Sequence, residues 1–189
     1  AWRNMRRSIE FTCVNILGLA IGLAGFVIIL VYLNYEKSYD TWHKDLQLVH
    51  KVEMESDEGI LWDGRAQAPL ASFLKQSYPR VQEATGISSD GASDYEFLVD
   101  ANGKKIYQRG IIEADSLFFA VFPYEFIFGD RRSALNAPDA IVLEESVAKA
   151  YFGETDPIGQ PISIYAGRIT GKVTGVIKSP STPSLLNAR

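Results

Sequence analysis

Side chains that could do chemistry are few and widely spaced in this sequence. There are two histidines, His43 and His50, and a single cysteine, Cys13. Neither histidine has carboxylates around it at the spacing of a metal site, so both are predicted to be structural. One cysteine can build neither a disulfide framework nor a cysteine-ligated zinc site. No metal or cofactor is therefore expected.

Motifs for hydrolysis are also missing, since the sequence has no GxSxG, HExxH or SxxK. The stretch Gly167–Val173 resembles a phosphate loop, but it has one residue too few between its glycines and a valine where Ser or Thr must hold Mg²⁺. Glu144 and Glu145 are adjacent and point in different directions on a helix. We expect their negative charges to interact favourably with the positive N-terminal end of that helix. The sequence thus predicts a chain that is not an enzyme.

The part of the sequence from Leu46 to Glu113 shows strand and helix patterns. Leu46 to Met54 alternates apolar and polar residues, which predicts a half-buried strand. A helix is expected from Pro69 to near Tyr78. Two further strands are predicted at Val81–Ser88 and at Phe97–Val99, and the second continues through an Asn102-Gly103 turn into a returning strand, Lys105–Glu113.

The second half continues in the same mixed way. Ile141–Leu143 predicts a short strand, followed by a helix from Ser146 to Phe152 that Gly153 ends. A turn is expected at Asp156–Gly159, and Ile162 to Ile177 predicts a strand hairpin. Because strands and helices alternate without a regular βαβ period, the predicted fold class is α+β, with residues 34–189 as one domain.

The segment Leu117–Phe128 is unusually rich in aromatic residues. On burial statistics most of these rings are expected to form core. An aromatic substrate pocket is the alternative.

An uncharged run, Phe11–Leu33, comes before this domain. As a helix its 23 residues would span roughly 34 Å, enough to cross a bilayer. Arg3, Arg6 and Arg7 precede it, so the positive-inside rule predicts residues 1–10 in the cytoplasm, 11–33 in membrane lipid and 34–189 outside. That outer part has 16 cations and 22 anions, a net charge of −6, which disfavours nucleic acid.

A cleaved signal peptide and a buried helix of a soluble protein both agree less well with the apolar run. A signal peptide has a shorter apolar region, and here the small residues are followed by more apolar chain. A buried helix would be shorter and would lack the aromatic residues near the end of the run, Tyr32, Tyr35, Tyr39 and Trp42.

Within the run, Asn15, Gly18, Gly22, Gly25 and Ile29 follow a spacing of three and four, so they share one helical face. Gly18 and Gly22 form a GxxxG motif. Such a face is expected to pack on another helix, either of a second copy or of a different segment. Glycines that are merely tolerated in lipid are the alternative.

Five separated strings together resemble the MacB/FtsX-type ABC transporter permeases, in particular the periplasmic core domain of the version common in Bacteroidetes. They are NILGLAIGLA, NYEKSYDTWH, ADSLFFAVFPYEFIFGD, AIVLEESVAKAYFGETDPIGQPI and KVTGVIKSP. The resemblance covers nearly the whole chain and is weakest between Ser56 and Lys104. Departures from the family pattern are His50-Lys51, Glu144 in place of a capping Thr, Ser179-Pro180 and Thr182–Ser184.

The resemblance implies an inner-membrane permease subunit of an efflux or lipoprotein/peptide export system, of which this chain is a fragment. It would work with a separate cytoplasmic ABC ATPase and a second permease copy, and with a periplasmic adaptor and an outer-membrane channel. ATP-driven motion would pass through the membrane helix to the periplasmic domain. We expect Gly18, Gly22 and Gly25 to be the helix-packing face, with Asn15, and three residues to clamp the exit from the membrane: Tyr39, Asp40 and Trp42.

Two alternatives fit the same features. One is a membrane-anchored periplasmic sensor that reports a ligand across the membrane. The other is an FtsX-like permease that controls a cell-wall hydrolase and moves no substrate. Fold alone does not decide among them.

Overall fold

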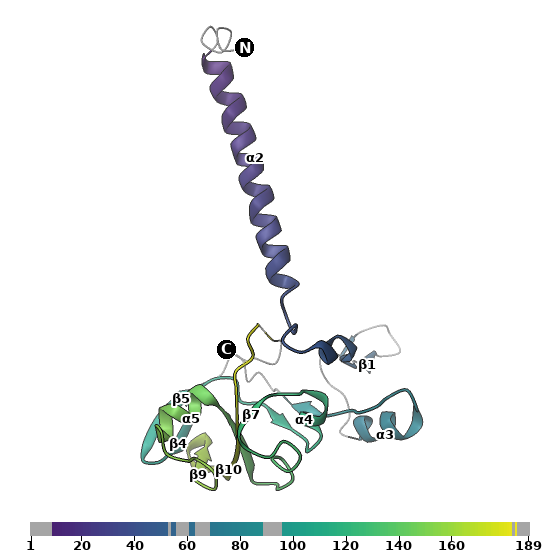
Figure 1. Cartoon of the computed structure of the whole chain (residues 1–189), viewed down its shortest axis with the longest axis vertical. Helices are drawn as coiled ribbons and strands as arrows, with labels where there is room; N and C mark the ends of the chain where they lie inside the picture. Colours follow the sequence, from purple (N-terminus) through teal and green to yellow (C-terminus); the bar gives the residue numbers. More distant parts are fainter. Residues whose placement is uncertain are drawn as a thin grey trace.

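The structure is a computed structural model, and it describes residues 9–52, 54–55, 61–62, 69–88, 96–182 and 184. It consists of one long helix and a mixed α and β domain from which that helix projects (Figure 1). The predicted α+β fold class, with an apolar helix before the domain, is confirmed.

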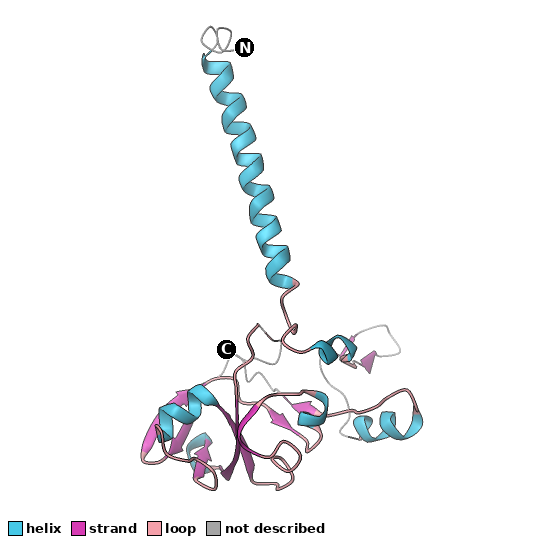
Figure 2. Cartoon of the chain, in the orientation of Figure 1, coloured by secondary structure: helices cyan, strands magenta, loops and turns pink. Residues whose placement is uncertain are grey.

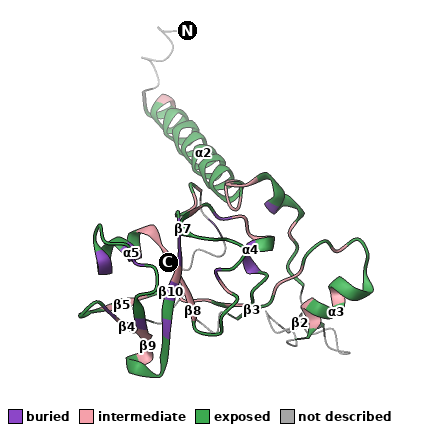
Figure 3. Cartoon of the chain, turned by 60° about the horizontal axis from the view of Figure 1, so that its bottom comes forward, coloured by how far each residue is buried: buried purple, intermediate pink, exposed green. Residues whose placement is uncertain are grey.

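The long helix α2 covers Ile9–Glu36, 28 residues. No charged residue lies between Glu10 and Glu36, and the residues of this part of the helix are exposed apart from Thr12 (Figure 3). A helix that is apolar all round and exposed has no face suited to water. Among the described residues, α2 is the helix that is long and apolar enough to cross a membrane. The predicted span, residues 11–33, lies inside it.

The strand predicted for Leu46–Met54 is wrong over most of its length. Lys44–Leu48 forms a 3₁₀ helix, η1, and only Met54–Glu55 is a strand, β1. The His43 side chain accepts a hydrogen bond from the Asp45 amide, and this cap begins a helical turn. Leu46 of the expected apolar face is buried, whereas η1 turns Leu48 out to 75% exposure and Val52 is 49% exposed.

The elements that follow are short and lie beside the main sheet (Figure 2). β1 pairs antiparallel with β2, Leu61–Trp62. Helix α3, Leu70–Ser77, confirms the prediction of a helix after Pro69. The strand predicted at Val81–Ser88 is reduced to β3, Ile87–Ser88.

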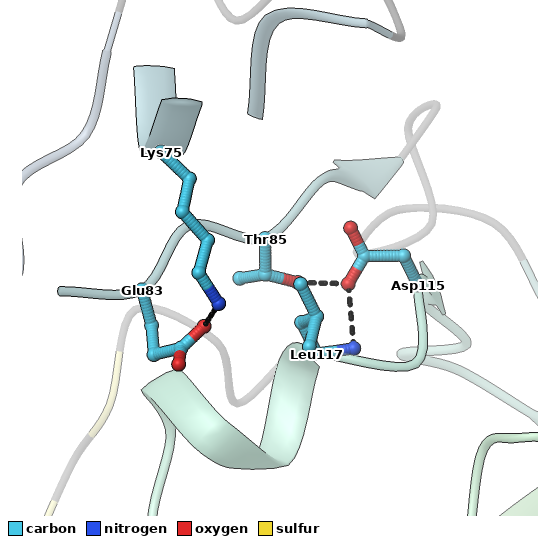
Figure 4. A network of polar contacts seen from close by, with 5 residues as sticks. All are labelled: Lys75, Glu83, Thr85, Asp115 and Leu117. Atoms are coloured by element: carbon cyan, nitrogen blue, oxygen red, sulfur yellow. Dashed lines mark hydrogen bonds and ion pairs between the residues drawn. The ribbon is translucent and has the colours of Figure 1, made fainter. Parts of the chain in front are cut away.

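Asp115 fixes the chain that leads into β3 (Figure 4). Its carboxylate accepts hydrogen bonds from the Thr85 hydroxyl at 2.6 Å, the Gly86 amide at 2.8 Å and the Leu117 amide at 2.9 Å. β3 then pairs antiparallel with β6, Glu113–Ala114. The Asp115 carboxylate thus holds two stretches of chain, the one at Thr85 and Gly86 and the one at Leu117.

The main sheet has six strands. They are β4 Phe97–Ala101, β5 Lys104–Gln108, β7 Phe126–Gly129, β8 Ala140–Glu144, β9 Pro161–Ile164 and β10 Ile169–Ile177. The order is β5-β4-β9-β10-β7, and β8 pairs parallel with β10. The Asn102-Gly103 hairpin is confirmed, but its returning strand ends at Gln108 instead of Glu113. Residues 113–114 pair with β3 instead.

Strand β10 is the centre of the sheet, since it pairs with β7, β8 and β9. It includes most of Gly167–Val173, so the prediction that this stretch is strand is confirmed from Ile169 onward. Gly171 is needed because a Cβ there would collide with the Asp139 carbonyl oxygen and lie 2.7 Å from Cδ1 of Ile141. Close approach of β8 therefore depends on that glycine.

Helix α5, Glu145–Phe152, follows β8 directly and ends at Gly153, as predicted. It places Tyr151, which is completely buried, in a core cluster with Val99, Ile162 and Val173. The Tyr151 hydroxyl lies 3.3 Å from the carbonyl oxygens of both Val99 and Ile106. The helix is thereby joined to the β4–β5 hairpin.

A second core cluster forms around the short helix α4, Phe118–Val121. Phe118, Phe119 and Tyr124 are buried and their rings contact one another. The prediction that most rings of the aromatic segment form core is therefore confirmed, while Phe128 is 43% exposed. Both clusters include residues of β10, so one strand joins them.

Substitution of Gly171 by alanine is predicted to destabilise the domain by about 1 to 3 kcal/mol, because the new methyl group collides with backbone as well as side chain. The measurement is the free energy of unfolding of the detergent-solubilised chain by chemical denaturation. Gly86→Ala is the matched control: its added Cβ would meet only Asp115 Oδ2, at 3.7 Å, so a change within about 1 kcal/mol is expected. Equal losses in the two variants would contradict this account.

Candidate functional site

The helix α2 is attached to the domain by Trp42. The Trp42 ring lies against the Tyr124 ring, with 4.8 Å between centroids and 39° between planes, and belongs to the second core cluster. Its Nε1 is buried and has no hydrogen-bond partner within the described part of the chain. The contact is therefore one of ring packing.

Asp40 makes a second attachment two residues earlier. Its backbone is in the left-handed region, with φ of 53°. The Asp40 carboxylate accepts a hydrogen bond from the Ser184 hydroxyl, Oγ to Oδ1 2.5 Å. Ser184 is only 4% exposed. We call the group of Asp40, Trp42, Tyr124 and Ser184 the junction.

Tyr124 lies at the centre of the junction. Burial, together with the negative charges of Glu144 and Asp40, raises the pKa of Tyr124 to about 12, and a hydrogen bond with Ser184 opposes this increase. The hydroxyl is thus held in its neutral form by its surroundings.

Ser184 reaches the junction because the chain turns back after β10. The segment from Lys178 runs toward the end of the domain where α2 is attached (Figure 1). The Lys178 amide donates to the Glu125 carbonyl, and the Ser179 hydroxyl donates to Glu144 Oε2 at 2.9 Å. Glu144 is the N-cap residue of α5, but its side chain caps no amide of that helix. The Glu144 carboxylate instead binds Ser179, in the segment that turns back after β10.

The predicted exit clamp is divided by the structure. Asp40 and Trp42 lie in the junction, whereas Tyr39 contacts Tyr35 at the end of α2, with 5.3 Å between ring centroids and 3.1 Å between hydroxyl oxygens. Ser38 and Thr41 donate to the carbonyls of Tyr35 and Ser38, so the turn after α2 is well hydrogen-bonded.

The predicted helix-packing face, which we call the glycine face, consists of Gly18, Gly22 and Gly25 with Asn15. It lies on α2, apart from the junction. Asn15, Gly18, Gly22 and Gly25 are all exposed on α2, and a Cβ added at any of these glycines would meet no atom within 4 Å. Within the described residues this face thus has free space for another helix. Its packing role stays a prediction.

The residues considered for chemistry are dispersed. His43 begins η1, His50 is exposed, and Glu145 pairs with Lys149 at 2.6 Å along α5. No group of three or more metal-ligating side chains occurs in the described ranges.

The sequence alone does not point to Tyr124 and Ser184 as functional residues. Tyr124 is one of the predicted aromatic core residues, and its polar surroundings come from other segments. Ser184 is 144 positions from Asp40. No local pattern links residues so far apart; only the tyrosine hydroxyl, which needs a partner when buried, is a usable signal.

An apolar helix long enough to cross a membrane, attached to an α+β domain, is the architecture of a membrane-anchored domain. The model of the MacB-like periplasmic core domain family matches residues 12–188. The chain therefore belongs to the MacB-like periplasmic core domain family. No curated protein sequence gives a match.

Solved structures are also similar to it, among them the following two. One is the periplasmic region of MacB from Actinobacillus actinomycetemcomitans, at 21% identity and a TM-score of 0.44, covering 59% of this chain and 51% of that one. The other is the extracellular domain of the noncanonic ABC-type transporter YknZ from Gram-positive bacteria, at 16% identity and a TM-score of 0.44, covering 70% and 67%. The chain thus spans about half to two thirds of these two solved chains.

Replacement of Trp42 by alanine is predicted to destabilise the domain by about 2 to 4 kcal/mol, because it removes a large ring from the second core cluster. Trp42→Phe keeps a ring and removes the unpaired N–H, so a loss below about 1 kcal/mol is expected. Chemical denaturation in detergent measures both. Leu48→Ala, at an exposed apolar position, is the control and should change little. Equal losses for phenylalanine and alanine would show that the indole N–H does have a partner.

The raised pKa of Tyr124 predicts a loss of stability at alkaline pH. Below pH 10 the hydroxyl is protonated in both states; above it the unfolded chain loses its proton first, so stability falls until the folded pKa of about 12 is passed. Between pH 9 and 11 the parent chain should lose about 1 to 2 kcal/mol more than Tyr124→Phe. Denaturation at the two pH values measures the difference, and identical losses would contradict the shift.

Proposed function

We propose that this chain is part of a permease subunit of an ABC transporter, of the efflux or lipoprotein/peptide export type, that passes ATP-driven motion to its periplasmic domain. A separate cytoplasmic ATPase would supply that motion. A second permease copy is the expected partner in the membrane, and a periplasmic adaptor and an outer-membrane channel are expected outside it. The observation that supports this most directly is the junction, because it holds an apolar helix firmly against a folded periplasmic domain.

Residues 1–10 are assigned to the cytoplasm, 11–33 to the inner membrane and 34–189 to the periplasm. The three arginines before the apolar run support this orientation, since cytoplasmic flanks are enriched in positive charge. The helix continues unbroken to Glu36, so a tilt or shift of the spanning part would reach the periplasmic side without a hinge. Trp42 would then pass the displacement into the second core cluster.

The glycine face is proposed as the surface on which α2 moves against its neighbour. Small residues let helix backbones approach closely and slide with little obstruction. Asn15 adds a polar group to that face and could hydrogen-bond a neighbouring helix in lipid. Tyr35 and Tyr39, whose hydroxyls meet at the end of α2, suit the headgroup layer.

The test uses the full-length permease with its ATPase in proteoliposomes, in a Cys13→Ser background. A single cysteine is introduced at the exposed Lys37, and its maleimide labelling rate is measured with and without ATP. We expect ATP to change the rate at least roughly twofold. Gly22→Leu should abolish the change, because the larger side chain blocks helix packing.

Ala20→Leu is the matched control, because it adds a leucine to the opposite face of the same helix turn and should keep the response to ATP. If labelling at Lys37→Cys and along residues 34–42 is independent of ATP in the parent protein, the proposed function is refuted. Equal effects of the Gly22 and Ala20 substitutions would reject the glycine face.

A further inference from the structure

Two segments that are far apart in the sequence meet where α2 joins the domain. One is residues 38–42, by which the chain enters the domain. The other is residues 178–184, apart from residue 183, and it follows β10. Figure 1 shows the second segment turning back toward the first. The hydrogen bond from Ser184 to Asp40 joins them across 144 sequence positions.

The backbone around Asp40 directs its carboxylate to this contact. A φ of 53° is unfavourable for most residues, although aspartate tolerates it better than most. The turn is held by the Ser38 hydroxyl on the Tyr35 carbonyl at 2.6 Å and the Thr41 hydroxyl on the Ser38 carbonyl at 2.8 Å. These two bonds hold the turn that contains Asp40.

Burial makes the contact strong. Ser184 is 4% exposed, so its polar side chain is buried. A buried hydroxyl that lost its partner would keep the full penalty of desolvation, and a charged acceptor makes a stronger bond than a neutral one. Exposed pairs such as Lys75 with Glu83 are screened by water and contribute less.

We propose that the Asp40–Ser184 hydrogen bond is a latch, a positioning pair that makes residues 38–42 and 178–184 move as one unit. Trp42 joins α2 to the core. The latch joins residues 38–42, which include Trp42, to residues 178–184, which follow the strand β10. Displacement of α2 then reaches both segments together. The latch is a property of the fold, and only its part in transmission depends on the proposed function.

The test is amide hydrogen exchange, measured by mass spectrometry on the full chain in lipid nanodiscs. Ser184→Ala removes the donor, and Asp40→Gly removes the acceptor while glycine accepts the positive φ. Each should speed exchange roughly three- to tenfold in both segments. Ser184→Ala also removes the hydrogen bond to Tyr124, so it should have the larger effect of the two. The double variant should be no faster than Ser184→Ala alone, because the Asp40–Ser184 bond is already lost in that variant.

Two controls accompany these variants. Asp40→Asn keeps an acceptor and tolerates the left-handed backbone but loses the negative charge, so its exchange rates should lie between those of the parent and those of Asp40→Gly. Ser179→Ala removes a bond of the returning segment to Glu144 but none to the entry segment, so only residues 178–184 should exchange faster.

Several results would overturn the latch. Independent and additive effects, with Ser184→Ala changing only the second segment and Asp40→Gly only the first, would show that the two are not joined. An equal rise in β10 would show that the bond supports the whole domain instead of joining two segments.

A second measurement, on the full-length permease with its ATPase, tests the part in transmission. ATP should change exchange in both segments of the parent protein, but only in residues 38–42 of Ser184→Ala. If ATP changes neither segment in the parent, the proposed function fails, while the latch is still judged by the first measurement. If both segments still respond in Ser184→Ala, transmission by the latch fails and the proposed function stands.

Discussion

The packing of Trp42 on Tyr124 is the contact on which the arrangement of this molecule depends. It joins α2 to the domain together with a short turn and the Asp40–Ser184 bond. A ring contact suits this position, because it resists displacement in many directions and needs no single hydrogen-bond geometry. The neighbouring Asp40–Ser184 hydrogen bond depends on direction, so it fixes an orientation that ring packing alone does not.

The core on which Trp42 rests is organised by β10. This strand pairs with three others and belongs to both hydrophobic clusters, so a force applied at the second cluster is applied to the whole sheet. Close packing makes such an interior resist deformation. The domain is therefore suited to move as a body, and the mobile element of the proposed function is the helix in the membrane.

The features predicted correctly from the sequence are those with strong local signals. Asn102-Gly103 marks a hairpin, Gly153 ends α5, and an uncharged run defines α2. The prediction at Leu46–Met54 is wrong because the His43 cap begins a helical turn that the alternating pattern does not reveal. Of the site, Asp40 and Trp42 are predicted, but Tyr124 and Ser184 are not, because their roles come from contacts between distant segments.

The distance along the chain between Asp40 and Ser184 also sets an order of assembly. During synthesis α2 and the entry segment emerge early, whereas Ser184 emerges only after all six strands of the sheet. Contacts between distant residues form late because a long loop must first be closed. The Asp40–Ser184 bond is thus formed last, after the sheet exists, and a chain stalled before residue 184 would hold its helix by the Trp42 ring contact without this bond.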